Sequence, residues 1–458
     1  MKTRPRLTVE TSPIPLTFKW KIIFFQFFAS ALNVTIQGYP QGLQTNLLAP
    51  PYNFTNFQYG IFYGIPSFPN IILPIFVGMY IDKHGFSLYM VICLEALVIL
   101  GISIVALGSC YVSYSIMVIG QFLMGIGSEN IQLLIKRFVL KLSSKEDSLK
   151  IWGINLVSLR VGTLLSSTMG PLIYSWTENV SDCFYFEIFI AIAVCICFNL
   201  SYLFSFRAGI LDPLPNKENN DDETSLVENE SMIDGLKRFF KQTDRIFWLV
   251  ILLISTNFIM IYGLFSEVNN LIMKASNISS LEASYFLVFY SILAGFFQVL
   301  DGFVFARLGY YIYTMIIGCF FQIISSFLFI GSFLMNNEYS AFLPLGFFAF
   351  GYSLSSTFVF SSIAFIVDRK FYGVAYGVVQ CAMDFGATFG STIFGFIKDI
   401  SLSVMEGYFW PLIETATFQT LNLILALSIL ILDAFTLKVL SKKRQVILEI
   451  QSTPSPHA

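Results

Sequence analysis

Long apolar runs dominate this sequence and limit what the chain can fold into. A helix needs about 20 apolar residues to cross a hydrocarbon layer of roughly 30 Å, and stretches of this length occur throughout the chain. The 458 residues are 55% hydrophobic and only 12% charged, which leaves too little polar surface for a soluble protein. The sequence therefore predicts an all-α membrane protein with twelve transmembrane helices. The predicted spans are residues 20–39, 57–79, 87–108, 115–138, 150–174, 184–206, 246–272, 282–305, 311–333, 341–366, 373–397 and 416–439.

The longest polar interruption, residues 207–245, divides the spans into two sets of six. It contains an acidic run at 217–223 that is typical of disorder, and then an amphipathic segment at 232–240 that is able to lie on the membrane face. The predicted organisation is a pair of six-helix bundles with polar tails. Its parts are the N-terminal tail 1–19, the N-terminal bundle 20–206, the linker 207–245, the C-terminal bundle 246–439 and the C-terminal tail 440–458.

The basic residues predict the orientation of the chain. Nearly all of the 27 Lys and Arg residues fall in the two tails, in the linker and in the loops that follow even-numbered spans. Because such residues accumulate on the cytoplasmic side of membranes, both termini are expected to be cytoplasmic. The glycosylation sequons at Asn53, Asn179 and Asn277 fall in three loops on the opposite side. Their position predicts a glycoprotein and agrees with this orientation.

An internal repeat relates the two halves. When the chain is laid on itself with an offset of 224 residues and no gaps, Gly127 falls on Gly351 and Gly162 falls on Gly386. The same offset aligns residues 78–85 with residues 302–309. Several coincidences at one offset indicate duplication. Two parallel repeats that each span the membrane are expected to pack as pseudo-symmetric bundles around a ligand site near the bilayer midplane.

Two charges lie deep inside apolar spans. Glu129 and Arg160 flank a segment, residues 136–150, that is too polar to be buried and is therefore expected to mark the membrane surface. Counted from that surface, both lie about 13 to 15 Å deep, where an unpaired arginine costs about 2.5 to 3.5 kcal/mol. One reading is a permanent structural ion pair between neighbouring helices. The functional reading is a substrate site in which Arg160 binds a carboxylate and Glu129 orients the arginine or receives an amino group.

The repeat adds a third charge to this site. At the 224-residue offset Arg160 falls on Asp384, so opposite charges occupy pseudo-symmetric positions. We expect a zwitterionic substrate to bridge Arg160 and Asp384 and to draw the bundles together. In the empty site, Glu129 is expected to hold the arginine.

A polar stripe marks the first span. Ser30, Asn33, Gln37 and Gln41 share one helical face, and the repeat adds Asn257 in the seventh span. The stripe is expected to line the central cavity, with hydrogen bonding between helices as the alternative. Tyr63 and Gln380 are added to the substrate-binding set as an aromatic wall and an amide.

Three further carboxylates lie in or near apolar runs: Glu95, Asp301 and Asp433. A carboxyl group buried in a membrane is able to carry a proton, so these residues and Glu129 are candidates for coupling transport to protons. The sequence leaves uniport and proton symport open.

The loop after the second span carries a family resemblance. Its Gly78-x-x-x-Asp82-Lys83-x-Gly85 pattern resembles the signature loop of the major facilitator superfamily, with Ala306-Arg307 in the second copy. The resemblance implies a gate in which Asp82 meets the N-terminus of the eleventh helix and closes the cytoplasmic side. The gating set is Gly78, Asp82, Lys83, Gly85 and Arg307.

Within the superfamily, four short segments resemble the lysosomal dipeptide uniporter group: residues 67–70, 125–129, 158–162 and 375–380. The resemblance implies alternating-access uniport of dipeptides from a lysosome-like or vacuolar compartment, a glycosylated accessory subunit, and substrate binding by Glu129 and Arg160. The alternatives are the plasma membrane as location, an organic anion or sugar carrier, and a non-transporting receptor on this fold.

Catalysis finds little support in the sequence. The only histidines are His84 in a loop and His457 in the tail, and there is no HExxH motif, P-loop or nucleophile elbow. The pair Gly125 and Gly127 inside a membrane span indicates close helix packing and not a dinucleotide site. No enzyme activity, cofactor, metal or nucleic acid is expected. The expected partners are a small-molecule substrate and the lipid bilayer.

Overall fold

A computed structural model describes most of the chain, with gaps at the termini, in the linker and at a few loops. The described residues are 16–84, 87–142, 148–208, 232–308, 310–335, 337–367, 371–401, 404–435 and 440–441. The acidic part of the linker, most of both polar tails and Gly85 lie outside them.

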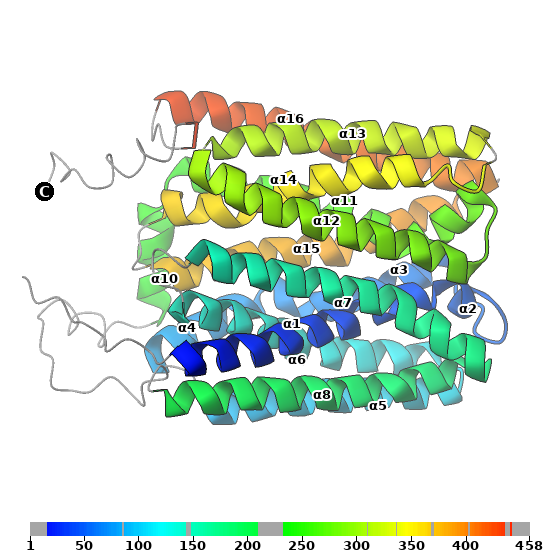
Figure 1. The fold of residues 1–458 in the computed structure, drawn as a ribbon, viewed down its shortest axis with the longest axis horizontal. Coiled ribbons are helices and arrows are strands. Elements are labelled where there is room, and N and C mark those ends of the chain that lie inside the picture. Colours follow the sequence, from blue (N-terminus) through cyan, green and yellow to red (C-terminus); the bar gives the residue numbers. More distant parts are fainter. Residues whose placement is uncertain are drawn as a thin grey trace, which may run out of the picture.

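The described chain is helical and crosses the membrane in twelve segments (Figure 1). Nine helices in the described part are long and apolar enough to span a membrane by themselves. The other crossings are a broken second span, α14, and the glycine-rich α15. The long helices are α1 (Leu16–Gly42), α5 (Leu88–Cys110), α6 (Tyr114–Leu142), α7 (Ser148–Thr177), α8 (Val180–Arg207), α11 (Arg245–Ser276), α12 (Ser280–Leu308), α13 (Tyr311–Met335), α14 (Phe342–Ile366), α15 (Tyr372–Asp399) and α16 (Val404–Phe435).

The second span is not the single helix that its hydropathy suggests. It consists of α3 (Asn56–Gly64), two 3-10 turns and α4 (Leu73–His84), and the short α2 (Gln44–Leu48) precedes it. Each of the two turns has a proline in its first two positions, Pro66 in the first turn and Pro69 in the second. The α-helix breaks here because proline lacks the N–H that the helix needs. Asn70 repairs part of the break by donating from Nδ2 to the carbonyl oxygens of Pro66 and Gly125, at 3.0 and 2.9 Å. Irregular backbone at this depth is thus kept inside protein, as the membrane requires.

The two halves form separate cores. One cluster of buried apolar side chains contains residues from Ala29 to Phe198, and two further clusters contain residues beyond the linker. Between the halves, α7 packs along α12, and α15 packs along α3 and α4. Figure 1 shows the N-terminal half, from blue α1 to green α8, beside the C-terminal half, which runs from bright green to red. Large apolar side chains such as Phe189, Phe296 and Leu343 are exposed on the outer faces, where lipid would cover them.

The internal repeat is visible in the helix contacts. An added Cβ at Gly351 would lie 2.7 Å from the carbonyl oxygen of Gly318, and one at Gly127 would meet that of Leu94. Leu94 and Gly318 are themselves related by the 224-residue offset. The glycines therefore allow the same close approach in each half, α5 against α6 and α13 against α14. At Gly125 the added atom would collide with the backbone of Pro66, which confirms that this glycine serves packing.

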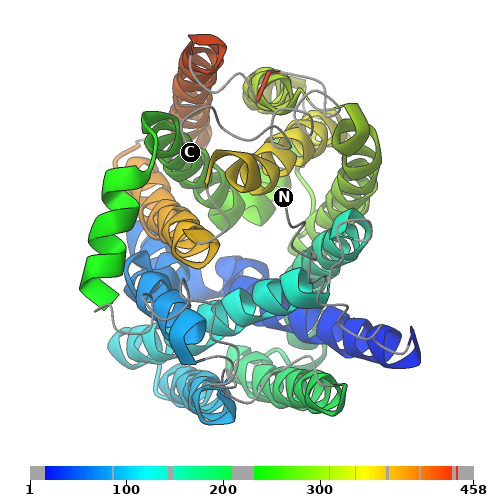
Figure 2. The ribbon, with the colours of Figure 1, turned by 90° about the vertical axis from the view of Figure 1, so that its left-hand side faces the viewer.

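The amphipathic part of the linker forms α10 (Met232–Gln242). Phe239 is fully buried and packs edge-on against Phe247 and Phe371, while Phe240 stacks on Trp248 with ring centroids 5.0 Å apart. Figure 2 shows this helix, in bright green, beside α11 and α15 at one end of the molecule. We call this the α10 end, which the sequence predicts to be cytoplasmic, and the opposite end the α2 end.

Candidate functional site

A cavity of about 120 Å³ lies between the bundles. It is smaller than the roughly 300 to 1000 Å³ of most ligand pockets, so the site is contracted in this structure. Gln37, Tyr63, Glu129 and Arg160 line it, as the sequence analysis expects of a central site. The C-terminal bundle contributes aromatic and apolar walls, which are Phe258, Ile261, Tyr262, Phe265 and Tyr352.

Arg160 reaches from α7 across the interface into the C-terminal bundle. Its Nε donates to Oε1 of Gln298 on α12 at 2.9 Å, and its guanidinium carbon lies 4.4 Å from the ring centroid of Tyr352 on α14. Gln298 is held in turn by donating from Nε2 to the hydroxyl of Ser356 at 3.2 Å. The arginine is 9% exposed, so its charge is held by an amide, a π-face and the cavity.

The expected ion pair between Glu129 and Arg160 is wrong for this state. No salt bridge joins these two described residues, and Glu129 instead accepts a hydrogen bond from Ser67 at 3.4 Å. The physical reason is the packing of α7 along α12, which carries the guanidinium toward the C-terminal bundle and away from α6. Gln298 and Tyr352 hold the arginine in this structure.

A second polar bridge between the bundles contains a residue that the sequence analysis missed. Lys136 on α6 donates from Nζ to Oε1 of Gln380 on α15 at 2.7 Å. Gln380 donates from Nε2 to Oδ1 of Asp384 at 2.8 Å, and Asp384 is 3% exposed. Its Oδ2 is buried and accepts no hydrogen bond from any residue in the described ranges. Neither Gln380 nor Asp384 is among the residues that line the cavity, and their expected role in substrate binding stays a prediction.

The polar segment that begins at residue 136 is not exposed throughout, as its composition suggested. The helix α6 continues to Leu142, and Lys136 is only partly exposed within it. A signal was present in the sequence, because Lys136 follows Glu129 by seven residues, which is two helical turns on the same face. A long apolar stem allows lysine to enter such an interface from a helix end.

The polar stripe on α1 divides between two roles. Gln37 and Gln41 line the cavity. Asn33 donates to the carbonyl oxygen of Ser128 at 3.0 Å, and Asn257 accepts from Gln419 at 3.1 Å. Both asparagines are at most 1% exposed and join helices within their own bundles, which fits the alternative of hydrogen bonding between helices. Neither lines the described cavity, and their role in substrate binding stays a prediction.

The three carboxylates considered for proton coupling have local partners. Both oxygens of Glu95 accept from the Asn199 amide at 2.8 Å. Asp301 accepts a hydrogen bond from the Ser353 hydroxyl, and Asp433 accepts from the backbone N–H groups of Leu440 and Ser441. None of these acids lines the central cavity, so each is accounted for by packing within its half.

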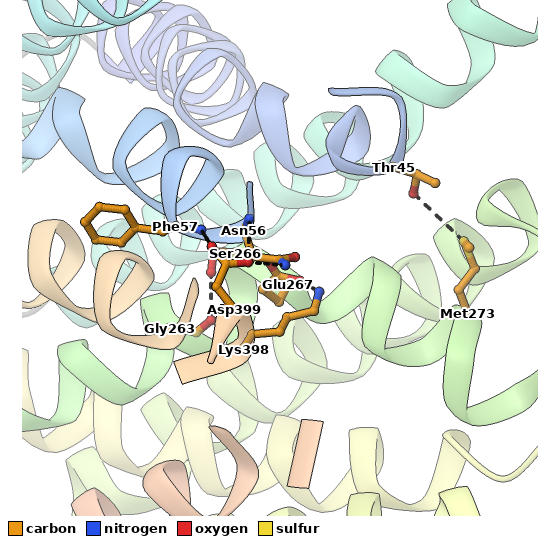
Figure 3. Close-up of polar contacts among 9 residues, drawn as sticks. All are labelled: Thr45, Asn56, Phe57, Gly263, Ser266, Glu267, Met273, Lys398 and Asp399. Carbon is orange, nitrogen blue, oxygen red and sulfur yellow. Dashed lines mark hydrogen bonds and ion pairs between the residues drawn. The ribbon is translucent and has the colours of Figure 1, made fainter. Parts of the chain in front are cut away.

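At the α2 end, an acid closes the interface between the bundles (Figure 3). Asp399 at the end of α15 accepts from the backbone N–H of Asn56 at 3.1 Å, its side-chain amide at 2.6 Å and the N–H of Phe57 at 2.8 Å. Because α3 begins at Asn56, this carboxylate sits at a helix N-terminus, a favourable place for an anion. The neighbouring Lys398 pairs with Glu267 on α11 at 2.5 Å, inside the C-terminal bundle.

The predicted gate at the α10 end lies largely outside the described side chains. Gly78 is buried in α4, which runs to His84 and so includes the backbone of Asp82 and Lys83. Arg307 lies near the end of α12. The side chains of Asp82, Lys83 and Arg307 are not described, and their gating role stays a prediction.

The three sequon asparagines are exposed and lie in loops at the α2 end. Asn53 lies between α2 and α3, Asn179 precedes α8, and Asn277 caps the end of α11. All three are accessible for modification, on the side opposite α10.

These features define a polytopic helical membrane protein with a small charged site between two repeated bundles. The sequence model of the Major Facilitator Superfamily matches residues 23–433, and the chain belongs to this superfamily of transporters. It is 22% identical over 366 residues to the human lysosomal dipeptide transporter MFSD1, covering 79% of this chain and 76% of the relative. The cow protein of the same name is 21% identical over 352 residues, covering 76% and 72%.

Solved structures agree with the fold. The proton:xylose symporter XylE with a bound sugar analogue superposes with a TM-score of 0.67 at 17% identity, covering 94% of this chain and 99% of the other. A bacterial homologue of the human lysosomal transporter Spinster, inward-facing and occupied, gives a TM-score of 0.63 at 13% identity, covering 92% and 98%. At these identities the likeness concerns the fold alone.

Proposed function

We propose that this protein moves small zwitterionic peptides, dipeptides above all, across a lysosome-like membrane by alternating access. The observation that supports this most is a pair of opposite charges, Arg160 and Glu129, on the wall of one cavity, with Asp384 in the second polar bridge between the bundles. Arg160 provides a cation that no described carboxylate neutralises, while Glu129 and the free oxygen of Asp384 provide acceptors for an ammonium group. The relatives named as dipeptide transporters support the same substrate class.

In the proposed mechanism the substrate carboxylate takes over the arginine fork. Gln298 accepts from Nε of Arg160 and leaves the terminal guanidinium nitrogens to bind a carboxylate in a bidentate manner. The substrate ammonium binds Glu129 or Oδ2 of Asp384. Since Arg160 belongs to the N-terminal bundle and Asp384 to the C-terminal bundle, one substrate would touch both bundles and favour their closure around it.

We propose uniport, because Glu95, Asp301 and Asp433 are each engaged away from the cavity, and the fourth candidate for proton coupling, Glu129, is assigned to the substrate ammonium group. The α2 end would face the lumen, where the three sequons are accessible to glycosylation and where a glycosylated accessory subunit would bind. A mobility shift after glycosidase treatment, lost in the triple Asn→Gln variant at Asn53, Asn179 and Asn277, tests this side of the proposal.

Blocked dipeptides test the substrate class directly. An unmodified dipeptide is expected to raise the melting temperature of the purified protein, while its N-acetyl and C-amide forms bind about tenfold or more weakly, since each lacks one charge-assisted contact. Thermal denaturation with increasing ligand is the measurement. If the N-acetyl form binds as well as the free dipeptide, the site is that of an organic anion carrier and the proposal fails.

Asp384→Asn tests the contact with the substrate ammonium group without disturbing the fold. The amide keeps the size of the side chain and an oxygen for Gln380, but it removes the charge that attracts the ammonium group. Dipeptide uptake is expected to fall about tenfold or more. Glu338→Gln serves as a control, since Glu338 is exposed in the turn before α14 and lines neither described cavity. Unchanged affinity and uptake in Asp384→Asn would remove Asp384 from the mechanism.

A further inference from the structure

A second, larger hollow lies on the outer side of the C-terminal bundle. This lateral crevice has a volume of about 590 Å³, between the end of α15 and the first half of α16. Its walls include Ile397, Ile400, Trp410 and Ile413, and it shares no lining residue with the central cavity. Ile400 is 64% and Trp410 56% exposed, so the crevice opens toward the surface that faces lipid. Its volume falls within the range of ligand pockets.

One acid lies inside this apolar crevice. Glu414 is ten residues into α16 and seven residues into its apolar span, which begins at Gly407, so it lies about 10 Å along the membrane helix. Its Oε2 is buried and accepts no hydrogen bond from the residues that the structure describes. An ionisable side chain at this depth is costly and needs a partner.

The polar side chains near Glu414 donate hydrogen bonds to other groups. Ser401 donates to the carbonyl oxygen of Ile397 at 2.9 Å, and Thr417 donates to that of Ile413 at 2.8 Å. Lys398 turns into the bundle, to Glu267 and over the ring of Tyr408. The crevice therefore presents an acceptor without a donor from its own walls. A partner for the acid would have to enter from the membrane.

We propose that the lateral crevice binds a membrane amphiphile with a cationic amine headgroup. The ammonium group would pair with Glu414 beside the Trp410 ring, and the alkyl chain would lie along Ile397, Ile400 and Ile413. Glu187 is a buried acid that a ligand cannot reach. It is fully buried, both of its carboxylate oxygens are without a partner in the described structure, and it lines neither described cavity. Of these two acids, only Glu414 lines a crevice that opens toward the lipid-facing surface.

Quenching of Trp410 fluorescence tests the site. The purified protein in phosphatidylcholine nanodiscs is titrated with chain-brominated hexadecylamine and, separately, with equally brominated hexadecanol. The amine is expected to quench saturably and at least about tenfold more tightly than the alcohol, because only the amine makes a charge-assisted contact. The Trp410→Phe variant should lose the saturable part, which assigns it to this tryptophan among the five of the chain.

Three variants locate the binding. Glu414→Gln should weaken amine binding at least about tenfold and leave dipeptide counterflow intact, while Thr417→Val on the same wall should bind the amine normally. Ile413→Trp, which fills the crevice without touching the acid, should also abolish binding. Equal quenching by amine and alcohol, or amine binding that is unchanged in Glu414→Gln, overturns the proposal. A co-purifying membrane protein that covers Glu414 and keeps the amine from binding would overturn it too.

Discussion

Replacing Arg160 by lysine is expected to lower dipeptide uptake about 10- to 100-fold while the protein still folds. Lysine keeps the positive charge, so the aromatic wall and the nearby acids are not left with an unpaired charge, a defect that typically costs about 3 to 5 kcal/mol. It loses the planar fork that binds Gln298 and a carboxylate together, and a hydrogen bond to a charged group contributes about 1.5 to 3 kcal/mol. Uptake of labelled dipeptide into proteoliposomes measures the effect.

The matched control is Arg207→Lys, the same exchange at the exposed end of α8. It should transport like the wild type. If Arg160→Lys is monodisperse and transports at the wild-type rate, the guanidinium fork has no part in substrate binding.

Gly60→Val is expected to hold the α2 end open. An added Cβ at Gly60 would collide with the backbone carbonyl of Ser391 on α15, with the carbonyl carbon 3.0 Å away. Backbone atoms cannot turn aside, so α3 and α15 must separate. Overpacking of this kind typically costs about 1 to 3 kcal/mol, which shifts an equilibrium between closed and open states by about 5- to 150-fold. The penalty falls only on the state in which the helices touch.

The readout is labelling of Gln41→Cys, on the cavity wall, by an impermeant maleimide in a background without the exposed Cys93 and Cys110. Gly60→Val should accelerate labelling from the α2 end and lower transport. Gly331→Val is the control, because an added Cβ there meets nothing within 4 Å. Asp399→Ala should act in the same direction and more weakly, since an anion at an exposed helix N-terminus contributes about 0.3 to 1 kcal/mol. Unchanged labelling in Gly60→Val would mean that α3 and α15 do not part at this end.

The fold was predictable because its main determinants are periodic. Apolar length predicts the spans, and the shared offset of Gly127 with Gly351 predicts the repeated helix contacts that the structure contains. The break in the second span was not predicted, although Pro66 and Pro69 were visible. Hydropathy averages over such residues, and it does not register that Asn70 compensates the broken backbone.

The site was only partly predictable, because contacts across the interface depend on the relative position of whole helices. Glu129, Arg160 and Gln37 were expected on the cavity wall and lie there. The partner of Arg160 was predicted wrongly, since sequence proximity favoured Glu129 while helix packing selects Gln298 and Tyr352. Asn33 and Asn257 show the same limit. Helical periodicity places both on a polar face, and only the packing tells whether that face meets the cavity or a neighbouring helix.

The contact of Asp399 with the N-terminus of α3 was not foreseen either. Asp399 lies in a predicted loop, where an acidic residue is common and does not indicate a contact. Its partners include backbone N–H groups, which no sequence motif identifies. A helix start is recognisable in the sequence from the cap at Thr55 and Gln58, but its pairing with a residue some 340 positions away is a property of the closed state alone.

Counterflow in liposomes tests the central claim most directly. The purified protein is reconstituted with unlabelled dipeptide inside and labelled dipeptide outside, with no pH gradient and no membrane potential. The account predicts that label accumulates through the wild-type protein, and that Arg160→Lys exchanges at least about tenfold more slowly. Absence of dipeptide exchange by the folded wild-type protein, under conditions where a labelled organic anion or sugar does exchange, would contradict it.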